Sequence, residues 1–395
     1  MSVLLLIIGL LLFIGLVVAH EWGHFIMARR NGVEVEEFGI FFPPRLFKHK
    51  TKGGWLFTIN LLPLGGFVKL KGEHDTDTAK GSFGAATVWA KTQIMAAGVL
   101  VNLIIALVLL TVVAVLGMPK LVDNQFTVAS DTHQIRHATS SVEVDEVAQG
   151  SPSQKAGLKL NDLITGLGPT GQVQKITSVS ELQSATKRYA GQEVQVRYTR
   201  DNESKVASTT LNTAATVAAA QKTNHPVGYL GVTLDEVKSG FDVRRSTWSA
   251  PIVAVGTSYQ FTVLTFQGLG HALGGLGSLI AGGVTGDTVA RQHGQTSASS
   301  QVGGPVAIFF VLKEGSVQGV SFMLFIIGIV SLTLAIMNIL PIPALDGGRL
   351  WLTLITRALK RPLSPRREEI INATGFLVLI TLIVLITIVD FQRFL

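Results

Sequence analysis

Four long runs without a charged side chain constrain this chain more than any other feature. They cover Met1–Ala19, Thr92–Pro119, Gly315–Leu345 and Ile370–Val389. A helix needs about 20 apolar residues to cross a bilayer, so each run predicts one membrane-spanning helix. Charged residues make up only 15% of the chain, against about 25% in soluble domains. We therefore predict a polytopic α-helical membrane protein with four transmembrane helices.

The first run could instead be a cleaved signal peptide. It lacks a basic start, it is long, and cleavage near Ala19 would separate it from the residues that follow. We therefore expect a retained first helix that ends at Arg29 and Arg30.

The positions of basic residues predict the orientation of the helices. Ten Lys and Arg residues lie between Arg29 and Lys91, and a second basic group precedes the last run: Arg357, Lys360, Arg361, Arg366 and Arg367. Basic loops face the cytoplasm, so both termini and residues 120–245 are expected outside. The net charge of +7 is explained by these loops, and no motif supports binding of nucleic acid.

Residues 246–314 begin with an uncharged stretch that is rich in Gly, Ser and Thr. A further crossing there would place the second basic group outside, against the charge bias. We expect an interfacial or amphipathic helical segment instead. The expected parts are thus 1–119, 120–245, 246–314 and 315–395.

Two regions between the helices have a recognisable character. Gly54–Asn60 and Gly66–Leu70 predict two short strands around a Pro63–Gly65 turn. This is either an ordinary surface hairpin or a membrane-associated β-hairpin that dips toward the active site and holds substrate by strand addition. Outside, Gly150–Ile164 resembles a PDZ domain, a mixed α/β unit of about 125–215 that binds peptide ends, except that Asn161 replaces the usual Gly.

The chemistry-bearing motif is His20-Glu21-Trp22-Gly23-His24 at the end of the first run. Helix positions i and i+4 share a face, so both imidazoles can bind one metal ion, and Glu21 lies beside them as a general base. This is the zinc metalloprotease pattern. The alternative is a pair of helix histidines near a membrane surface, but His and Glu are costly at membrane depth and usually functional. With no cysteines, a Cys-liganded metal and a Cys nucleophile are excluded.

A catalytic zinc usually has a third protein ligand. The metzincin extension fails, because Met27 and Arg30 occupy its positions. Glu34, Glu36 and Glu37 fall in an expected polar loop. Asp346 ends the third run after Pro341 and Pro343, which break the helix, and it lies on the same side of the membrane as the histidines. We favour Asp346 as ligand over a helix-capping role.

Taken together, His20-Glu21-x-x-His24, Asn338-x-x-Pro341-x-Pro343-x-x-Asp346-Gly347 and the PDZ-like insert resemble the bacterial site-2 protease family of intramembrane zinc proteases. The resemblance implies Zn²⁺ bound by His20, His24 and Asp346, Glu21 as the base, and Asn338 binding the substrate backbone. It implies a bacterial plasma membrane enzyme. Its substrates would be single-span membrane proteins, such as anti-sigma factors or remnant signal peptides, already cut by another protease. Relatives have two PDZ units, whereas one is evident here.

One rival class is a non-enzymatic membrane protein, either a zinc-handling transporter or a peptide-binding receptor. Buried His and Asp also suit transport. Glu21 beside the paired histidines argues against it, since a transporter needs no general base and a receptor needs no metal. Gly98 and Asn102 lie four apart in the second run, and we assign both to helix packing.

Overall fold

The structure is a computed structural model, and it describes residues 2–73, 77–136, 139–200, 203–220, 227–239, 241–285, 305–359 and 364–394. Two compact units result: Met1–His133 together with Arg244–Leu395, and Gln134–Val243. Lys360, Arg361 and residues 286–304 of the expected interfacial segment lie outside the described residues.

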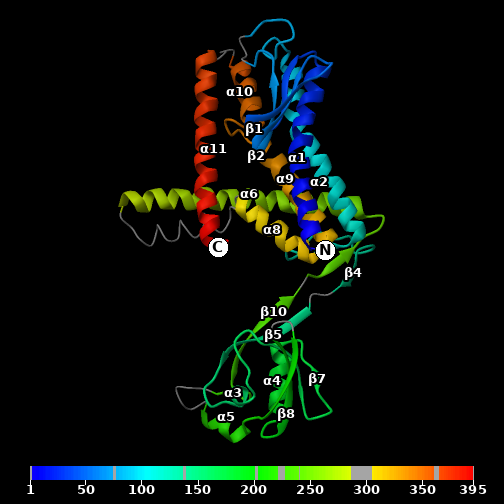
Figure 1. Cartoon of the computed structure of the whole chain (residues 1–395), viewed down its shortest axis with the longest axis vertical. Coiled ribbons are helices and arrows are strands. Elements are labelled where there is room, and N and C mark those ends of the chain that lie inside the picture. Colours follow the sequence, from blue (N-terminus) through cyan, green and yellow to red (C-terminus); the bar gives the residue numbers. More distant parts are fainter. Residues whose placement is uncertain are drawn as a thin grey trace. The chain divides into compact units, whose positions relative to one another are not determined.

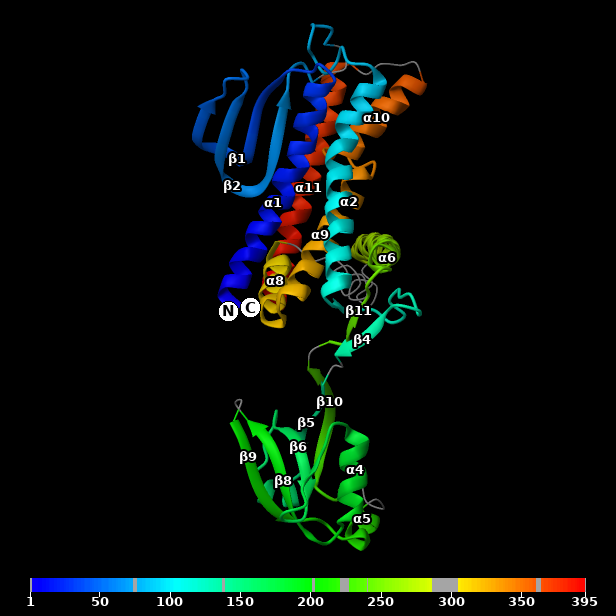
Figure 2. The same ribbon diagram turned by 90° about the vertical axis from the view of Figure 1, so that its right-hand side faces the viewer.

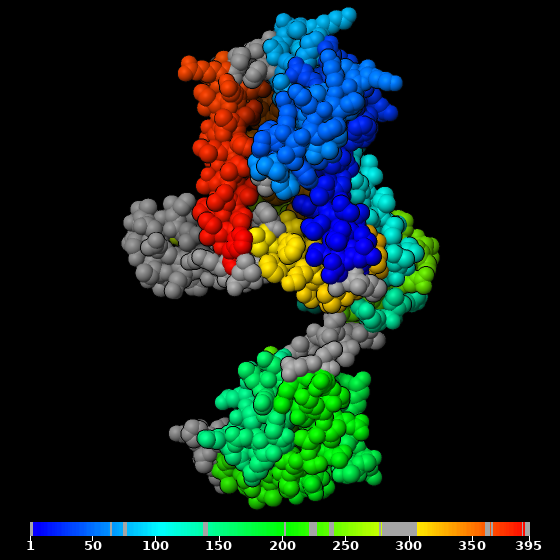
Figure 3. Space-filling model, viewed as in Figure 1, coloured from blue at the N-terminus to red at the C-terminus, as the bar shows by residue number. Residues whose placement is uncertain are grey.

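Within the described residues, four helices of the first unit are long and apolar enough to cross a membrane. They are α1 (Ser2–Arg30), α2 (Val88–Leu116), α9 (Val320–Ile339) and α11 (Pro365–Phe394). Large apolar side chains stay exposed along them, for example Leu4, Ile104 and Leu377, and Figure 3 shows α11 in red as an exposed column. Exposed apolar surface on this scale is expected where a helix faces lipid. The four apolar runs of the sequence therefore do form helices.

Helix α6 (Ala250–Thr285) has a different direction from the four apolar helices. It lies crosswise to α1 and α2 in Figure 1 and is seen nearly end-on in Figure 2. The carboxylate of Asp131 caps its start by accepting hydrogen bonds from the backbone N–H groups of Thr247 and Ser249 and from both hydroxyls. Helix α8 (Pro305–Gln318) follows, and Gly319 with φ 105° separates it from α9.

The predicted hairpin around Pro63–Gly65 is wrong. Strand β2 (Leu56–Leu70) runs through those residues without a break, and its partner is β1 (Val35–Lys50). Phe38 pairs with both Phe57 and Val68, so part of β1 lies between the two segments that we expected to pair. The expected polar loop at Glu34–Glu37 is accordingly mostly strand. Its one buried acid, Glu37, pairs with Arg45 and accepts a hydrogen bond from Thr58.

The second unit, Gln134–Val243, extends past the stretch of about 125–215 that we expected from the sequence. Its sheet has the order β10-β5-β6-β8-β9, and β7 pairs with β6. The strands are β5 (Thr139–Val147), β6 (Leu163–Gly168), β7 (Gln174–Lys175), β8 (Glu193–Arg200), β9 (Glu203–Thr210) and β10 (Val232–Ser239). The helices are α3 (Pro152–Lys155), α4 (Val179–Arg188) and α5 (Ala214–Ala220).

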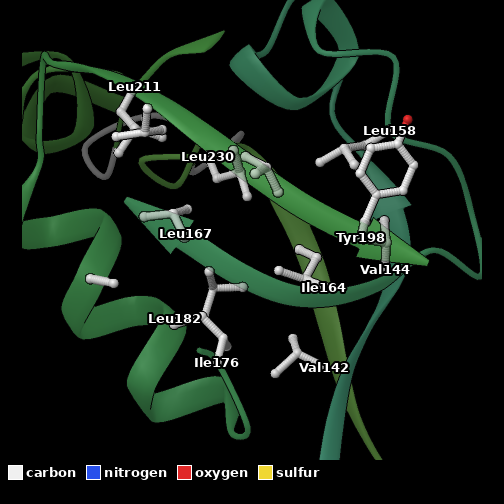
Figure 4. Close-up of a cluster of buried hydrophobic side chains, with 13 residues drawn as sticks. Val142, Val144, Leu158, Ile164, Leu167, Ile176, Leu182, Tyr198, Leu211 and Leu230 are labelled. Carbon is white, nitrogen blue, oxygen red and sulfur yellow. The ribbon is translucent and has the colours of Figure 1, made fainter. Parts of the chain in front are cut away.

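The core of this unit follows from alternation in its strands. Val194, Val196 and Tyr198 alternate with polar residues along β8 and point into the core, where Leu182 of α4 joins them. Figure 4 shows this cluster between the sheet and α4. Asn161, which replaces the Gly of the PDZ pattern, has φ 66°. Asn tolerates this left-handed conformation better than most residues, so the substitution is compatible with the fold.

Three short strands form a third sheet, in the order β3-β11-β4. They are β3 (Met118–Pro119), β11 (Val243–Arg245) and β4 (His133–Arg136).

Candidate metal centre

Helix α1 presents His20 and His24 to α2. Both side chains are buried, with 7% and 6% of their surface exposed. Between them, Gly23 allows a close approach, because a Cβ there would lie 2.9 Å from the carbonyl oxygen of Ala97. Small residues at such contacts let two helix backbones come together. The i, i+4 spacing and this contact place both imidazoles on the inner face of α1.

Asp346 reaches the histidines from the break after α9. The helix ends at Ile339, and α10 (Asp346–Ala358) begins with Asp346 itself. The intervening loop folds tightly onto the start of α10, since a Cβ on Gly347 would lie 2.3 Å from the carbonyl oxygen of Leu340. One turn on, Leu350 packs in a core with residues of α1, α2 and β2. These contacts fix the direction of the Asp346 side chain.

The three side chains form one cluster. Asp346 Oδ2 lies 2.9 Å from His20 Nε2 and 3.0 Å from His24 Nε2, and the two nitrogens are 3.2 Å apart. A tetrahedral zinc ion with bonds of about 2.0–2.1 Å separates its ligand atoms by about 3.3 Å. The donor set therefore fits zinc after movements of a few tenths of an ångström. Among the described residues, these three are the group whose potential ligand atoms lie close enough together to hold one metal ion.

Gly98 supplies the space beside these ligand atoms. A Cβ at Gly98 would lie 2.4 Å from His24 Nε2 and 2.7 Å from His20 Nε2. The absence of a side chain thus keeps open the point where both nitrogens converge. From the sequence we assigned Gly98 to helix packing and did not expect it at the site.

Asn102 was missed in the same way. Its side-chain nitrogen lies 3.2 Å from His20 Nδ1, and the residue is 1% exposed. The corresponding nitrogen of His24, Nδ1, donates a hydrogen bond of 2.7 Å to the carbonyl oxygen of Ile94. The available signal was a polar residue one turn after Gly98 in an uncharged run, which places both residues on one face of α2.

Glu21 lies at the boundary between the cluster and the β-sheet. Its side chain is half-buried, and a Cβ on Gly66 of β2 would lie 2.9 Å from Glu21 Cγ. The strand backbone therefore passes directly beside the expected base. Asn338 is half-buried in the last turn of α9 and is not part of the three-residue cluster.

A cavity of about 470 Å³ adjoins Asp346 between α10 and α11. Its polar lining includes Arg349, Glu369 and Asn372. Arg349 Nη1 lies 3.2 Å from Glu73 Oε2, and its guanidinium lies over the ring of Phe83. The cluster thus has a space large enough for water on its Asp346 side, lined by both polar and apolar side chains.

Comparison with known proteins gives a consistent result. A family model described as peptidase family M50 matches residues 8–382. A Clostridium perfringens protein named as a zinc metalloprotease is 27% identical over 98% of both chains. The zinc metalloprotease RasP of Shouchella clausii is 23% identical over 97% of both chains. A solved PDZ domain of an SdrC-like protein from Listeria monocytogenes matches 25% of this chain and 93% of its own, at 22% identity and a TM-score of 0.20.

The resemblance stated from the sequence motifs is therefore confirmed, and the transporter and receptor alternatives are not favoured. The protein is a zinc-dependent intramembrane protease. With the family model covering nearly the whole chain, the chain belongs to peptidase family M50, the site-2 protease family.

Proposed function

We propose that His20, His24 and Asp346 hold the zinc ion and that Glu21 is the general base for hydrolysis of peptide bonds within membrane-spanning segments. The observation that carries this assignment is the mutual approach of three ligand atoms from α1 and α10. The two histidines are far from Asp346 in sequence; both histidines are buried, and Asp346 is half-buried. A buried cluster of this kind is expensive without a function.

The chemistry follows from the residue types. Zinc held there would lower the pKa of a water molecule to about 7 and polarise the scissile carbonyl. Glu21 takes the proton of the attacking water and returns it to the leaving amine. The cavity beside Asp346 supports entry of water from the side of α10 and α11.

Substrate binding is proposed to use a strand edge. A membrane-spanning helix hides its amides in internal hydrogen bonds, so it must unwind locally before cleavage. Among the described strands, residues 66–70 of β2 pair only with residues 35–40 of β1. Leu70 N–H donates to Glu73 Oε1, so the other edge is available at residues 66–69. Gly66 of this edge lies beside Glu21. An unwound substrate segment could extend the sheet there, with Asn338 binding its backbone from α9.

The proposed topology has four spans, with both termini and the second unit outside the bacterial plasma membrane. A cavity of about 300 Å³ in that unit lies between α4 and the Gly228–Leu234 segment. A groove between a helix and a strand suits an extended peptide end, which supports a PDZ-like role. The proposed substrates are single-span membrane proteins that another protease has already cut outside.

The decisive experiment compares zinc content and cleavage in Glu21→Gln. Gln is nearly isosteric but cannot accept the proton, so the variant should bind zinc as wild type does and lose at least about 100-fold in cleavage. Both quantities are measured on detergent-purified protein, with a panel of tagged single-span substrates. The matched control is Glu193→Gln, which removes an exposed acid at the start of β8 in the second unit and should retain cleavage.

A companion variant tests the ligand set. Asp346→Ala removes the carboxylate that contacts both histidines and should lower zinc occupancy as well as cleavage. Unchanged zinc content in Asp346→Ala would remove Asp346 from the ligand set. Substantial cleavage by Glu21→Gln would instead remove Glu21 from its role as the base.

A further inference from the structure

The two histidines of the cluster differ in the hydrogen-bond partner of Nδ1, the ring nitrogen that does not contact Asp346. In His24 the partner is the carbonyl oxygen of Ile94, 2.7 Å from Nδ1. A carbonyl oxygen can only accept a hydrogen bond, so Nδ1 of His24 must carry the proton. Its Nε2 then offers a lone pair toward Asp346 and a metal ion. The backbone of α2 thus fixes His24 in the form that can ligate through Nε2.

His20 needs the same arrangement but faces a side chain. Its Nε2 also points to Asp346 Oδ2, at 2.9 Å, so ligation requires the proton on Nδ1 and an acceptor beside it. The neighbour of Nδ1 is the carboxamide of Asn102 at 3.2 Å. A carboxamide has a donor end and an acceptor end of nearly equal shape. Only its oxygen, Oδ1, can accept the proton of Nδ1.

The surroundings of Asn102 permit that orientation. Within the described residues, its buried Oδ1 has no hydrogen-bond partner, while Nδ2 faces His20. A half-turn of the amide therefore breaks no hydrogen bond of Oδ1 and reverses only the contact with His20. If Nδ2 of Asn102 faced Nδ1 of His20, Nδ1 would have to accept and the ring proton would lie on Nε2. That form of the ring cannot bind metal through Nε2.

Helix packing does not account for the Asn102 side chain. The contact between α2 and α9 at this point is made by the backbone, because the Ser331 hydroxyl donates to the carbonyl oxygen of Asn102 at 2.7 Å. Ser331 is fully buried. The carboxamide itself points to His20. Packing and ring orientation can therefore be separated by mutation.

We propose that Asn102 is a positioning residue that accepts a hydrogen bond from Nδ1 of His20 and thereby holds Nε2 of that ring ready for zinc. This inference rests on the proposed ligand set, and it adds a residue of α2 to a centre whose ligands come from α1 and α10. Residues that orient a metal-binding histidine typically change metal affinity 10- to 100-fold when mutated.

The test measures zinc affinity by chelator competition in detergent, independently of cleavage. Asn102→Leu keeps the shape but has no acceptor, and should weaken zinc binding by about 10- to 100-fold. Asn102→Asp keeps an acceptor oxygen and should bind zinc at least as tightly as wild type. Ser331→Ala loses the contact between the helices but not the contact with His20, and should leave zinc affinity unchanged.

The outcomes separate this inference from the ligand set on which it rests. His20→Ala is measured alongside: if it binds zinc normally, the proposed ligand set is wrong. If His20→Ala weakens binding but Asn102→Leu does not, or if Asn102→Asp fails as badly as Asn102→Leu, the role of Asn102 as acceptor is refuted. Melting temperatures verify that each variant is folded. Asn102→Ala replaces Asn102→Leu if the latter cannot be purified folded, because small residues suit this helix contact.

Discussion

Gly98 is the residue at which the metal centre is most easily blocked. Replacement by Ala places a methyl group 2.4 Å from His24 Nε2 and 2.6 Å from His20 Cε1, so the rings or α2 must move. We predict that Gly98→Ala lowers zinc affinity at least about 10-fold, as expected when orienting contacts of metal ligands are disturbed, while the fold persists. Zinc competition and thermal melting in detergent measure both effects.

The control for Gly98→Ala is Gly15→Ala on α1. A Cβ at Gly15 meets no atom within 4 Å, and Ala is a better helix former than Gly. This variant should bind zinc like wild type and be no less stable. If Gly98→Ala behaves like Gly15→Ala, the space beside Gly98 is not needed for metal binding.

The residues of the centre differ in how far the sequence predicts them. His20 and His24 are accessible because helical spacing alone brings i and i+4 together. Asp346 becomes accessible once the charge bias orients the helices. Gly98 and Asn102 are not, because their roles depend on which face of α2 turns toward α1. In an uncharged run nearly every face is apolar, so periodicity does not identify the inner face.

The β-sheet beside the centre shows a different limit at the scale of elements. Strand propensity and a Pro-Leu-Gly turn suggested that Gly54–Asn60 pairs with Gly66–Leu70. Instead, residues 37–40 of β1 pair with both segments. Turn residues report local geometry, whereas pairing between strands is decided by long-range contacts. Glu34, Glu36 and Glu37 suggested a polar loop, but Arg45 forms an ion pair with Glu37 within the sheet.

Helix α6 depends on one carboxylate for its start. Burial opposes the charged form of Asp131, but hydrogen bonds from Ser249 and Thr247 outweigh it and hold the pKa of Asp131 well below its ordinary value of 3.8. A lowered pKa in the folded state means that the cap stabilises fully above about pH 3.8 and loses its effect as the pH falls further. Anions at helix N-termini also favour the helix dipole.

We therefore predict that Asp131→Asn lowers the melting temperature at pH 7 and that its deficit is the same at pH 5. Below pH 3.8 the deficit should shrink, because the wild-type carboxylate then loses its advantage over the neutral amide. Glu146→Gln, at an exposed position of β5, is the neutralised control. A deficit that grows on acidification would contradict the capping role.

At the scale of the whole molecule, the charge distribution and the four apolar helices together predict one topology. Basic residues lie from the end of α1 to the start of α2, and again from the end of α10 to the start of α11. The first basic segment carries β1 and β2, so the sheet beside Glu21 belongs to the cytoplasmic side in this topology. The same parity places the second unit outside. An opposite orientation would require both basic groups to be translocated.

This topology can be tested directly because the chain contains no cysteine, so each introduced cysteine is the single thiol. Ser184→Cys in α4 and Phe391→Cys near the end of α11 should react with a membrane-impermeant maleimide while the plasma membrane is intact, once the envelope outside it admits the reagent. Lys52→Cys between β1 and β2, and Arg367→Cys at the start of α11, should react only after the plasma membrane itself is permeabilised. All four side chains are exposed, so burial does not explain a lack of labelling. The cysteine-free chain gives the background. Labelling of Lys52→Cys before permeabilisation, or protection of Ser184→Cys, would reverse the orientation and separate the sheet from the cytoplasm.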